Sequence, residues 1–293
     1  MNGICKDRAV IITGAGGGLG RAYALAFAAE GAGVVVNDIN QAAAQDTVAT
    51  IEASGGRAVV DRSDITSYDD SLNAVRAALD NFGGLHVVVN NAGICRDRMF
   101  ASMTEEDWDA VIAVHLKGHF CITSHAVHYW RGQSKEGKAV DARIINTSSG
   151  AGLNGSIGQS NYAAAKAGIA ALTINQAAEL ARYGITANAL APSARTGMTE
   201  EVFADMMKKP EDGGFDAFDP ANIAPLVVWL GSPGSAGVTG RVFEAEGGKI
   251  SIADGWRSTE PVDKGARWVP AEVGGAVDTL LQRCVPPQKV YGT

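Results

Sequence analysis

Short apolar runs alternate along the chain with longer Ala-rich segments in which apolar residues recur at helical spacing. The runs are unbroken in apolarity, which is typical of parallel strands that are covered on both faces. They occupy residues 10–12, 33–36, 58–60, 87–89 and 143–145, and residues 185–190 and 242–245 are candidate sixth and seventh strands. Alternating strands and helices form βαβ units, so the sequence predicts an α/β fold with a doubly wound sheet of about seven parallel strands and helices on both faces.

The predicted helices occupy residues 19–30, 40–54, 67–82, 104–131 and 160–183. Gly31, Gly55, Gly83 and Gly184 each stand just beyond one of these segments. Helices commonly end on a residue in the left-handed conformation, which glycine adopts without a steric penalty. We therefore expect these four glycines to end their helices.

A single catalytic domain is expected over residues 1–248, because no repeat or low-complexity linker divides the chain. Residues 249–293 are expected to form a C-terminal extension, with a helix near residues 270–283, that packs on its own subunit or on a neighbour. Residues 193–219 lack a strand and follow a predicted strand end, where either an active-site lid or an ordered surface loop would lie. A short helix is expected there at residues 200–208.

The chain has 293 residues, with 32 acidic and 25 basic side chains and a net charge of −7. This acidity argues against a nucleic-acid partner, which is bound by basic patches. No apolar run approaches the ~20 residues that span a bilayer, so no membrane partner is expected. The four cysteines are widely spaced and no secretory signal is visible, which predicts free thiols in a cytoplasmic protein.

A glycine-rich turn, TGAGGGLG at residues 13–20, joins the first predicted strand to the first predicted helix. Glycines let a backbone approach a pyrophosphate closely, and a helix N-terminus presents unpaired N–H groups to it. Such a turn is a weak indicator alone, but its position between a strand and a helix is the context of a dinucleotide site. The predicted phosphate-binding residues are Gly14, Gly17, Gly18 and Leu19.

Asp38 follows the second predicted strand, about twenty residues beyond the glycine turn. A carboxylate there accepts hydrogen bonds from the adenosine ribose hydroxyls and repels a 2′-phosphate. No Arg or Lys follows it directly or lies within the turn, so the sequence favours NAD over NADP. An alternative role for Asp38, as N-cap of the next helix, is compatible with binding. Asp64 and Ile65, after the third strand, are expected to contact the adenine.

Tyr162 and Lys166 lie four residues apart at the start of a predicted helix, which places both side chains on one face. A phenol has a pKa near 10, and a neighbouring ammonium and a nicotinamide cation would both favour its phenolate. Such a tyrosine can exchange a proton with an alcohol or carbonyl oxygen while hydride moves to or from the cofactor. The YxxxK pattern also occurs by chance on solvated helix faces. Ser149, at the end of the fifth strand, is expected to hydrogen-bond the reacting oxygen, with Ser148 as the alternative.

The glycine turn, NNAG at residues 90–93, Ser149 and YxxxK together resemble the motifs of the short-chain dehydrogenase/reductase family, in the family's order and spacing across residues 8–248. The resemblance implies a seven-stranded Rossmann sheet of order 3-2-1-4-5-6-7, a homodimer or homotetramer, and hydride transfer at a carbonyl or alcohol carbon. It also implies that Tyr162 is the acid/base, that Lys166 binds the nicotinamide ribose and tunes Tyr162, and that Ser149 orients the substrate. Asn91 and Gly93 would close the other side of the cofactor.

His115 departs from the family pattern, which has an asparagine at this position in the helix after NNAG. That asparagine holds a water that relays protons toward the lysine. A neutral imidazole has one donor and one acceptor and can hold the same water, while a packed histidine without a relay role is the alternative. His115 and His119 are four residues apart, but the sequence offers no third ligand beside them, so no metal site is expected.

Two segments, VHLKG at residues 114–118 and NALAPSARTGMT at residues 188–199, are similar to the dehydrogenase part of peroxisomal multifunctional enzyme type 2 and to related bacterial lipid- and sterol-degrading dehydrogenases. This resemblance implies oxidation of a 3-hydroxyacyl-CoA with NAD. The alternatives are a hydroxysteroid dehydrogenase, an NADPH-dependent 3-oxoacyl reductase, which Asp38 disfavours, and a non-catalytic NAD(H)-binding regulator. Arg195, Lys208 and Lys209 are either contacts for CoA phosphates or solvated surface charges.

Overall fold

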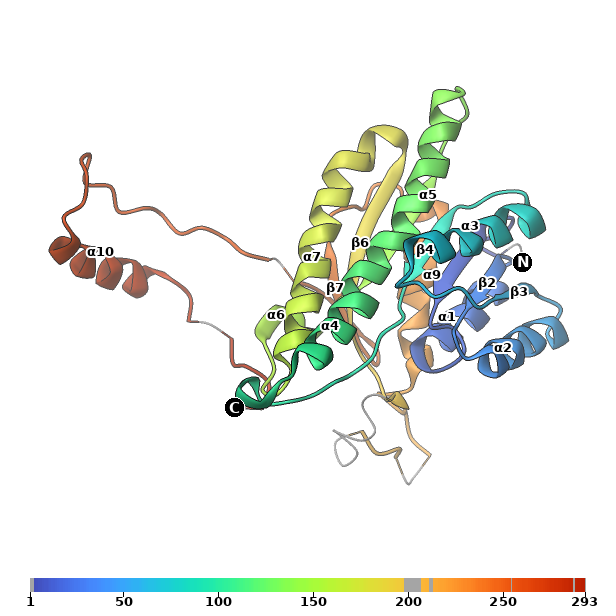
Figure 1. Ribbon diagram of the computed structural model, residues 1–293, viewed down its shortest axis with the longest axis horizontal. Helices are drawn as coiled ribbons and strands as arrows, with labels where there is room; N and C mark the ends of the chain where they lie inside the picture. The colour runs from blue at the N-terminus through green and yellow to red at the C-terminus, as the bar shows by residue number, and fades with distance from the viewer. Residues whose placement is uncertain (1–2, 198–206, 211–212, 254, 287, 293) are drawn as a thin grey trace.

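The computed structural model spans the chain, and the description covers residues 3–197, 207–210, 213–253, 255–286 and 288–292. In this part of the chain, eight strands form one sheet in the order β3-β2-β1-β4-β5-β6-β7-β8 (Figure 1). The strands are β1 (Ala9–Thr13), β2 (Gly33–Asn37), β3 (Arg57–Asp61), β4 (Val87–Asn90), β5 (Ala142–Thr147), β6 (Ile185–Ser193), β7 (Val242–Glu246) and β8 (Lys249–Ala253). The first seven are parallel, which confirms the predicted sheet and its order.

The eighth strand corrects the expectation of seven. It pairs antiparallel with β7 at the edge of the sheet, and only Gly247 and Gly248 join the two strands. A two-residue glycine turn is a strong hairpin signal, and Gly247 has the positive φ, +53°, that such turns use. The search for unbroken apolar runs missed β8 because its sequence, KISIA, alternates polar and apolar residues, with Ile250 and Ile252 largely exposed.

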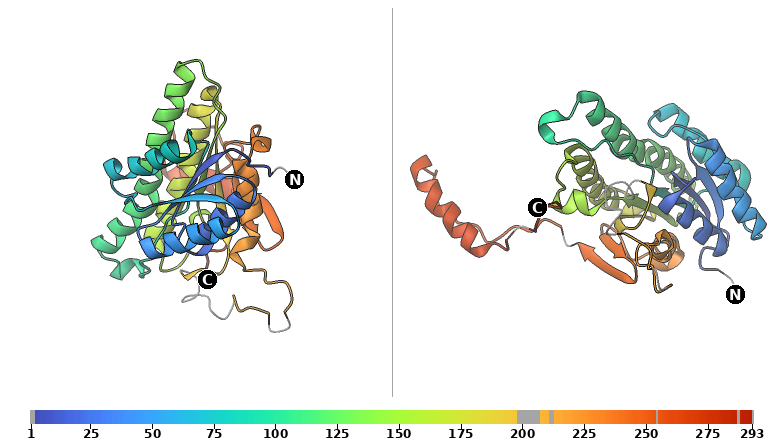
Figure 2. Two further views of the ribbon diagram at one scale, coloured as in Figure 1. Left: turned by 90° about the vertical axis from the view of Figure 1, so that its right-hand side faces the viewer. Right: turned by 90° about the horizontal axis from the view of Figure 1, so that it is seen from below.

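Helices cover both faces of the sheet (Figure 2). On one face the core is built with α1 (Gly18–Ala29), α2 (Gln41–Ala53) and α9 (Ala224–Gly231), and on the other with α3 (Tyr68–Phe82), α5 (Gly118–Lys135) and α7 (Ser160–Leu180). Within β1, Val10 and Ile12 contribute to the first core and Ile11 to the second. This division explains why successive residues of β1 are apolar, since alternate residues enter opposite cores.

The four glycines that were expected to end helices all have positive φ, between +75° and +88°. One predicted helix differs from expectation. Residues 104–131 form α4 (Glu105–Ile112), a π-helical segment Ala113–Lys117, and then α5. A π-turn inserts an extra residue into the helical ladder, and such turns are frequent at functional sites. It places His115 and His119 toward the sheet, where both side chains are buried.

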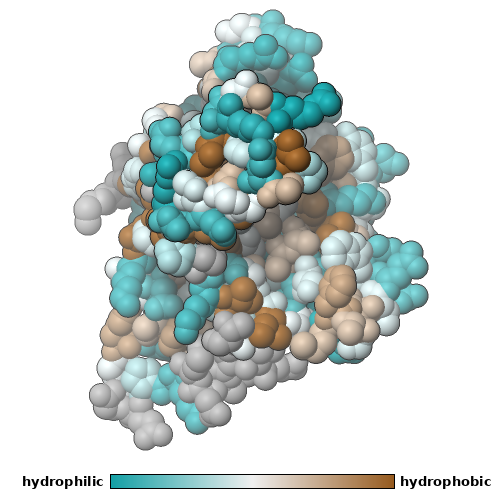
Figure 3. All heavy atoms as spheres, turned by 90° about the vertical axis from the view of Figure 1, so that its left-hand side faces the viewer, coloured by the Kyte–Doolittle hydropathy of each residue, from teal (hydrophilic) through white to brown (hydrophobic). Residues whose placement is uncertain are grey.

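The predicted C-terminal helix is present as α10 (Pro270–Arg283), and it lies away from the sheet (Figure 1). Val273, Val277 and Leu281 form an exposed apolar stripe along it, and hydrophobic side chains are visible among hydrophilic ones on this side of the molecule (Figure 3). The chain then returns, and Tyr291 pairs with the loop after α6 (Gly150–Asn154). The division of the chain at residue 248 into a catalytic domain and a C-terminal extension stays a proposal, although β8 extends the sheet beyond that residue.

Most of the helix expected at residues 200–208 lies outside the described residues. Over the described part of the chain, none of the helices combines the length and apolar character that crossing a bilayer requires.

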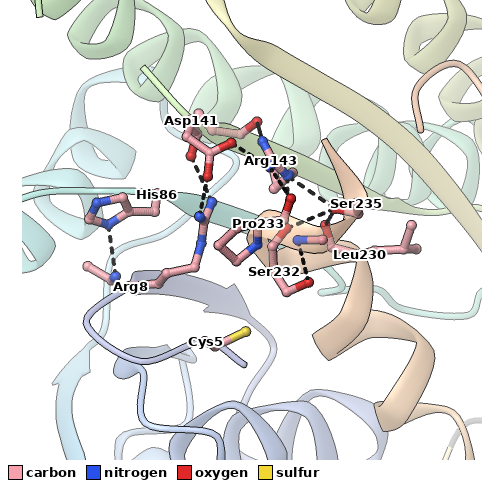
Figure 4. A network of polar contacts seen from close by, with 12 residues as sticks. Cys5, Arg8, His86, Asp141, Arg143, Leu230, Ser232, Pro233 and Ser235 are labelled. Atoms are coloured by element: carbon pink, nitrogen blue, oxygen red, sulfur yellow. Dashed lines mark hydrogen bonds and ion pairs between the residues drawn. The ribbon is translucent and has the colours of Figure 1, made fainter. Parts of the chain in front are cut away.

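An ion-pair network ties the amino ends of β1 and β5 together (Figure 4). Arg8 and Arg143, 5% and 1% exposed, each lie 2.5 Å from a different oxygen of Asp141. Arg143 also donates to the main-chain oxygen of Ser232 and to the Ser235 hydroxyl, just beyond α9. Burial tends to raise the pKa of Asp141, but the hydrogen bonds and charges of the two arginines outweigh it and hold that pKa below its usual value.

We predict that Asp141→Asn destabilises the fold, because it leaves two buried guanidinium groups sharing no carboxylate. Losing one partner of a fully buried pair costs about 3–5 kcal/mol, and the half-exposed position of Asp141 reduces this to about 2 kcal/mol. The lowered folded-state pKa means that the stabilisation is complete above the ordinary pKa of 3.8 and is lost as the pH falls through the lowered value.

Urea unfolding at neutral and acid pH measures both effects. The difference between wild type and variant shrinks in acid. Asp46→Asn is the control, because Asp46 pairs with Arg21 on the surface and its side chain is 72% exposed. Equal stability of the two variants at neutral pH would contradict this account of the network.

Candidate active site

All the predicted site residues lie around one cavity of about 560 Å³ at the carboxyl ends of the parallel strands. The glycine turn, the ends of β2 to β5 and the start of α7 supply its walls. The predicted residues that line it are Gly14, Gly17, Gly18, Leu19, Asp38, Asp64, Ile65, Asn91, Gly93, His115, Ser149, Tyr162 and Lys166. In open α/β sheets this edge is where ligands bind.

The glycine turn has the shape of a cradle. Gly14 has φ +63°, and a Cβ on it would lie 2.8 Å from Cα of Ala92. Gly18 has φ +51°, a conformation that side chains rarely adopt. Gly17, in contrast, is extended, is the N-cap of α1, and would carry a Cβ that meets no protein atom within 4 Å. The turn therefore exposes main chain and a helix N-terminus to the cavity, which suits a phosphate group.

The Asp38 carboxylate braces this turn from the end of β2. One oxygen accepts a hydrogen bond from the Gly16 N–H at 2.9 Å, and the other accepts from the Asn40 N–H at 2.8 Å. The N-cap of α2 is Asn40, whose side chain accepts from Ala43. The alternative role of Asp38 as that N-cap is therefore wrong, and its half-buried carboxylate lines the cavity instead.

Thr13 ties the glycine turn to the segment after β4, a contact that the sequence reasoning missed. Its hydroxyl accepts hydrogen bonds from the main-chain N–H groups of Asn91 and Ala92, at 2.9 and 3.0 Å. The Asn91 amide donates in return to the Thr13 carbonyl, at 3.0 Å. These hydrogen bonds therefore hold Asn91, which lines the cavity, against the end of β1.

Lys166 is 2% exposed and its ammonium donates to the main-chain oxygen of Thr147, at 2.6 Å. The same nitrogen lies 5.4 Å from the centre of the Tyr162 ring. Burial lowers the pKa of Lys166 to about 7. No sequence signal pointed to Thr147, because its contribution is a main-chain carbonyl.

Burial raises the pKa of Tyr162 to about 12, although a hydrogen bond with Ser149 acts in the opposite direction. This differs from the expectation that the neighbouring ammonium favours a phenolate. The reason is geometric, since the ammonium lies over the ring and desolvation of the phenolate dominates.

The structure separates the two candidate serines. The hydroxyl of Ser148 is buried and donates to the main-chain oxygen of Lys166, at 2.8 Å. Ser149 is the N-cap of α6, lines the cavity and bonds to Tyr162. This supports Ser149 rather than Ser148 as the residue that faces a substrate.

His115 packs edge-on against Tyr162, with ring centres 5.1 Å apart and planes at 88°. The Nε2 of His115 lies 2.8 Å from the carbonyl oxygen of Ile94 and 3.0 Å from the main-chain nitrogen of Ile94. Gly93 makes room for this ring, since a Cβ there would lie 2.3 Å from Cε1 of His115. Burial, followed by the charge of Lys166, lowers the pKa of His115 to about 3, so the imidazole is neutral. Its buried Nδ1 has no hydrogen-bond partner among the described residues.

The environments of two further side chains, Arg195 and Cys95, add to what the sequence predicted. The Arg195 guanidinium pairs with Asp216 and donates to the Met207 carbonyl, so it is not simply a solvated charge. Cys95, which sequence reasoning did not single out, lines the cavity, and burial raises its pKa to about 11. Within the described residues, no group of three or more His, Cys, Asp or Glu side chains is arranged to hold a metal ion.

Comparison with known proteins identifies the family. A family profile described as short chain dehydrogenase matches residues 8–207. The chain is 46% identical to hydroxyacyl-CoA dehydrogenase ChsB1 of Mycobacterium tuberculosis, over 98% of this chain and 93% of that protein. It is 42% identical to peroxisomal multifunctional enzyme type 2 of Mus musculus over 85% of this chain, but spans only 32% of that enzyme.

A crystal structure of a short chain dehydrogenase from Mycobacterium avium has the same fold, with a TM-score of 0.91 and 56% identity over 99% of this chain and 100% of that one. The protein thus belongs to the short-chain dehydrogenase family and is an oxidoreductase that acts on CH–OH groups with a nicotinamide cofactor, NAD or NADP.

Proposed function

We propose that this protein is an NAD-dependent 3-hydroxyacyl-CoA dehydrogenase of lipid or sterol side-chain breakdown. The observation that carries the proposal is the convergence of Ser149, Tyr162 and Lys166 on one cavity whose far end is bounded by Asp38. The names of ChsB1 and of the mouse multifunctional enzyme support the acyl-CoA substrate class. The intact acid/base set argues against a role as a non-catalytic NAD(H)-binding regulator.

The cavity fits a dinucleotide along its length. The cradle at Gly14, Gly17, Gly18 and Leu19 would hold the pyrophosphate, where Gly17 leaves space that a side chain would fill. Asp38 would accept hydrogen bonds from the adenosine ribose, with Asp64 and Ile65 at the adenine. Asn91, Gly93, Tyr162 and Lys166 would surround the nicotinamide end. When bound there, NAD supplies the hydride acceptor for a secondary alcohol.

The protein's own groups would handle the proton. Ser149 and Tyr162 would hold the alcohol oxygen between them, and Tyr162, as the phenolate, would take its proton as the carbonyl forms. The phenolate of Tyr162 would be favoured, against the effect of burial on its pKa, by the positive charge of a nicotinamide bound beside it. With a pKa of about 7, Lys166 can give or accept a proton near neutrality. The unpartnered Nδ1 of neutral His115 is a site for the water that would pass that proton on.

The choice of NAD over NADP is proposed from the charge at the end of β2. The Asp38 carboxylate is held in place by two main-chain N–H groups, where it would repel a 2′-phosphate. This is the feature that speaks against an NADPH-dependent 3-oxoacyl reductase.

A homodimer or homotetramer in the cytoplasm is also proposed. Exposed apolar side chains on α5, α7 and α10, such as Phe120, Ile174 and Leu281, support assembly with further copies. The four cysteines are free thiols, which is typical of proteins in a reducing compartment.

We predict that Gly17→Ala weakens NADH binding at least about 10-fold, because the methyl group would occupy the space that a pyrophosphate needs. Stability should fall by less than about 1 kcal/mol, since the backbone is extended there and only the N-cap preference changes. Fluorescence titration and thermal unfolding measure these effects. Gly132→Ala is the control, because a Cβ at Gly132 also meets no protein atom within 4 Å but lies far along α5. Native NADH affinity in a folded Gly17→Ala variant would sink the cradle assignment.

For Asp38→Asn, the expected result is a fall of at least about 10-fold in the preference for NAD over NADP, since the charge is lost while the shape is kept. Values of kcat/KM with each cofactor give the ratio. The amide keeps one acceptor oxygen, so it can retain only one of the two main-chain contacts, and NAD affinity measured beside the ratio separates loss of this bracing from loss of the charge. A ratio equal to that of wild type would refute the role of the carboxylate.

The substrate proposal is tested with NAD and a panel of 3-hydroxyacyl-CoAs of several lengths beside hydroxysteroids, and in reverse with 3-oxoacyl thioesters and NADPH. The expected result is the highest kcat/KM on a 3-hydroxyacyl-CoA. Tyr162→Phe should lower turnover by at least about 10³-fold while NADH affinity changes less than about 3-fold, because only the transferable proton is lost. Higher efficiency on steroids alone, or with NADPH, would replace the proposed substrate.

A further inference from the structure

His119 is a buried histidine directly behind the catalytic group, and nothing in the proposed mechanism uses it. Its side chain is 1% exposed, on the first turn of α5 after the π-helical segment. The main-chain N–H of Thr147 donates to its Nε2 at 3.4 Å. Thr147 is also the residue whose carbonyl receives the Lys166 ammonium at 2.6 Å. One residue of β5 therefore meets His119 on one side and Lys166 on the other.

This contact lies at the carboxyl end of β5, where Thr147 is still paired with Leu190 of β6. The last register pair of β4 with β5 joins Asn90 and Asn146, one residue before Thr147. The Arg143 N–H donates to the His86 carbonyl, and the two-residue repeat of a parallel strand turns the Thr147 N–H toward the same neighbour, β4. The imidazole of His119 is a side-chain acceptor within reach of this N–H.

The ring can do this only as a neutral acceptor. Burial, then the charges of Lys166 and His115, hold the pKa of His119 well below its usual value, although main-chain groups of His115 and Asn90 act in the opposite direction. If Nε2 accepts a hydrogen bond, the single ring proton is on Nδ1, which is buried and has no hydrogen-bond partner among the described residues.

We propose that His119 is a positioning residue: its Nε2 holds the main chain of Thr147, which in turn fixes the carbonyl that orients the ammonium of Lys166. This inference rests on the proposed roles of Lys166 and Tyr162. Two contacts, at 3.4 Å and 2.6 Å, lead from α5 through β5 to α7. A small shift of the Thr147 carbonyl moves the ammonium relative to the Tyr162 ring, and misplacement by about 1 Å near reacting groups can cost 10²-fold in rate.

Two variants of nearly equal shape separate the effect of the hydrogen-bond acceptor at residue 119 from the effect of side-chain packing. His119→Gln can keep an oxygen in reach of the Thr147 N–H, whereas His119→Met cannot. The Met variant is expected to bind NADH about 10-fold more weakly and to lose about 100-fold in kcat, with a smaller change in substrate KM. The Gln variant is expected to recover most of both losses. His128→Ala, an exposed position on the same helix, is the control and should behave as wild type.

Equal losses in the Gln and Met variants would overturn the proposal, because they would assign the effect to ring shape. Native NADH affinity and kcat in a folded Met variant would overturn it as well. If the Met variant does not fold, the wild-type protein labelled with ¹⁵N-histidine gives the answer. We expect His119 as the Nδ1–H tautomer between about pH 6 and about pH 9, and an Nε2–H tautomer or an imidazolium would contradict the inference.

These readouts are separable from the proposed function. Lack of activity on every 3-hydroxyacyl-CoA would remove the substrate assignment, while the NADH titrations and the tautomer would still decide the role of His119.

Discussion

The hydrogen bond from the buried ammonium of Lys166 to the carbonyl of Thr147 joins α7 to the end of β5, and the arrangement of the site depends on it. A lysine side chain that is buried away from solvent needs such a hydrogen-bond partner, because burial disfavours its charged form. This one contact places the ammonium over the Tyr162 ring, four residues earlier on the same helix. The neighbouring contact from the Ser148 hydroxyl to the Lys166 carbonyl aligns the helix with the loop that carries Ser149.

The parallel sheet explains why residues so distant in sequence meet. Parallel strands present all their carboxyl ends at one edge, and the segments that follow β1, β2, β4 and β5 supply the glycine turn, Asp38, NNAG and Ser149. The opposite edge carries the Arg8–Asp141–Arg143 network, which joins β1 to β5 beneath the site. The ion-pair network thus lies at the amino ends of the strands, and the candidate site lies at their carboxyl ends.

Much of this arrangement could be predicted from the sequence, because it depends on local signals. Apolar runs identified most of the strands. Glycines beyond the predicted helices identified the helix ends, and the structure gives these glycines positive φ. Motifs at strand ends identified residues that share one cavity. β8 escaped because an edge strand alternates polar and apolar residues. Sequence reasoning also missed the Thr147 carbonyl, the Thr13 hydroxyl and the π-helical turn. Main-chain groups, a hydroxyl that contacts only main chain, and irregular turns leave no distinct residue pattern. The rise of the Tyr162 pKa could not be predicted, because spacing gave the neighbouring lysine but not the degree of burial.

The central claim is that the Tyr162 hydroxyl, with Ser149 beside it and Lys166 behind it, faces the carbon that exchanges hydride with the cofactor. The most direct measurement is a crystal structure of the protein with NAD and an unreactive acyl-CoA analogue. We predict the dinucleotide pyrophosphate on the glycine turn, and both hydroxyls within hydrogen-bond distance of the analogue's 3-oxygen. A Tyr162 hydroxyl turned away from that oxygen, or a dinucleotide bound outside the cavity, would contradict the claim.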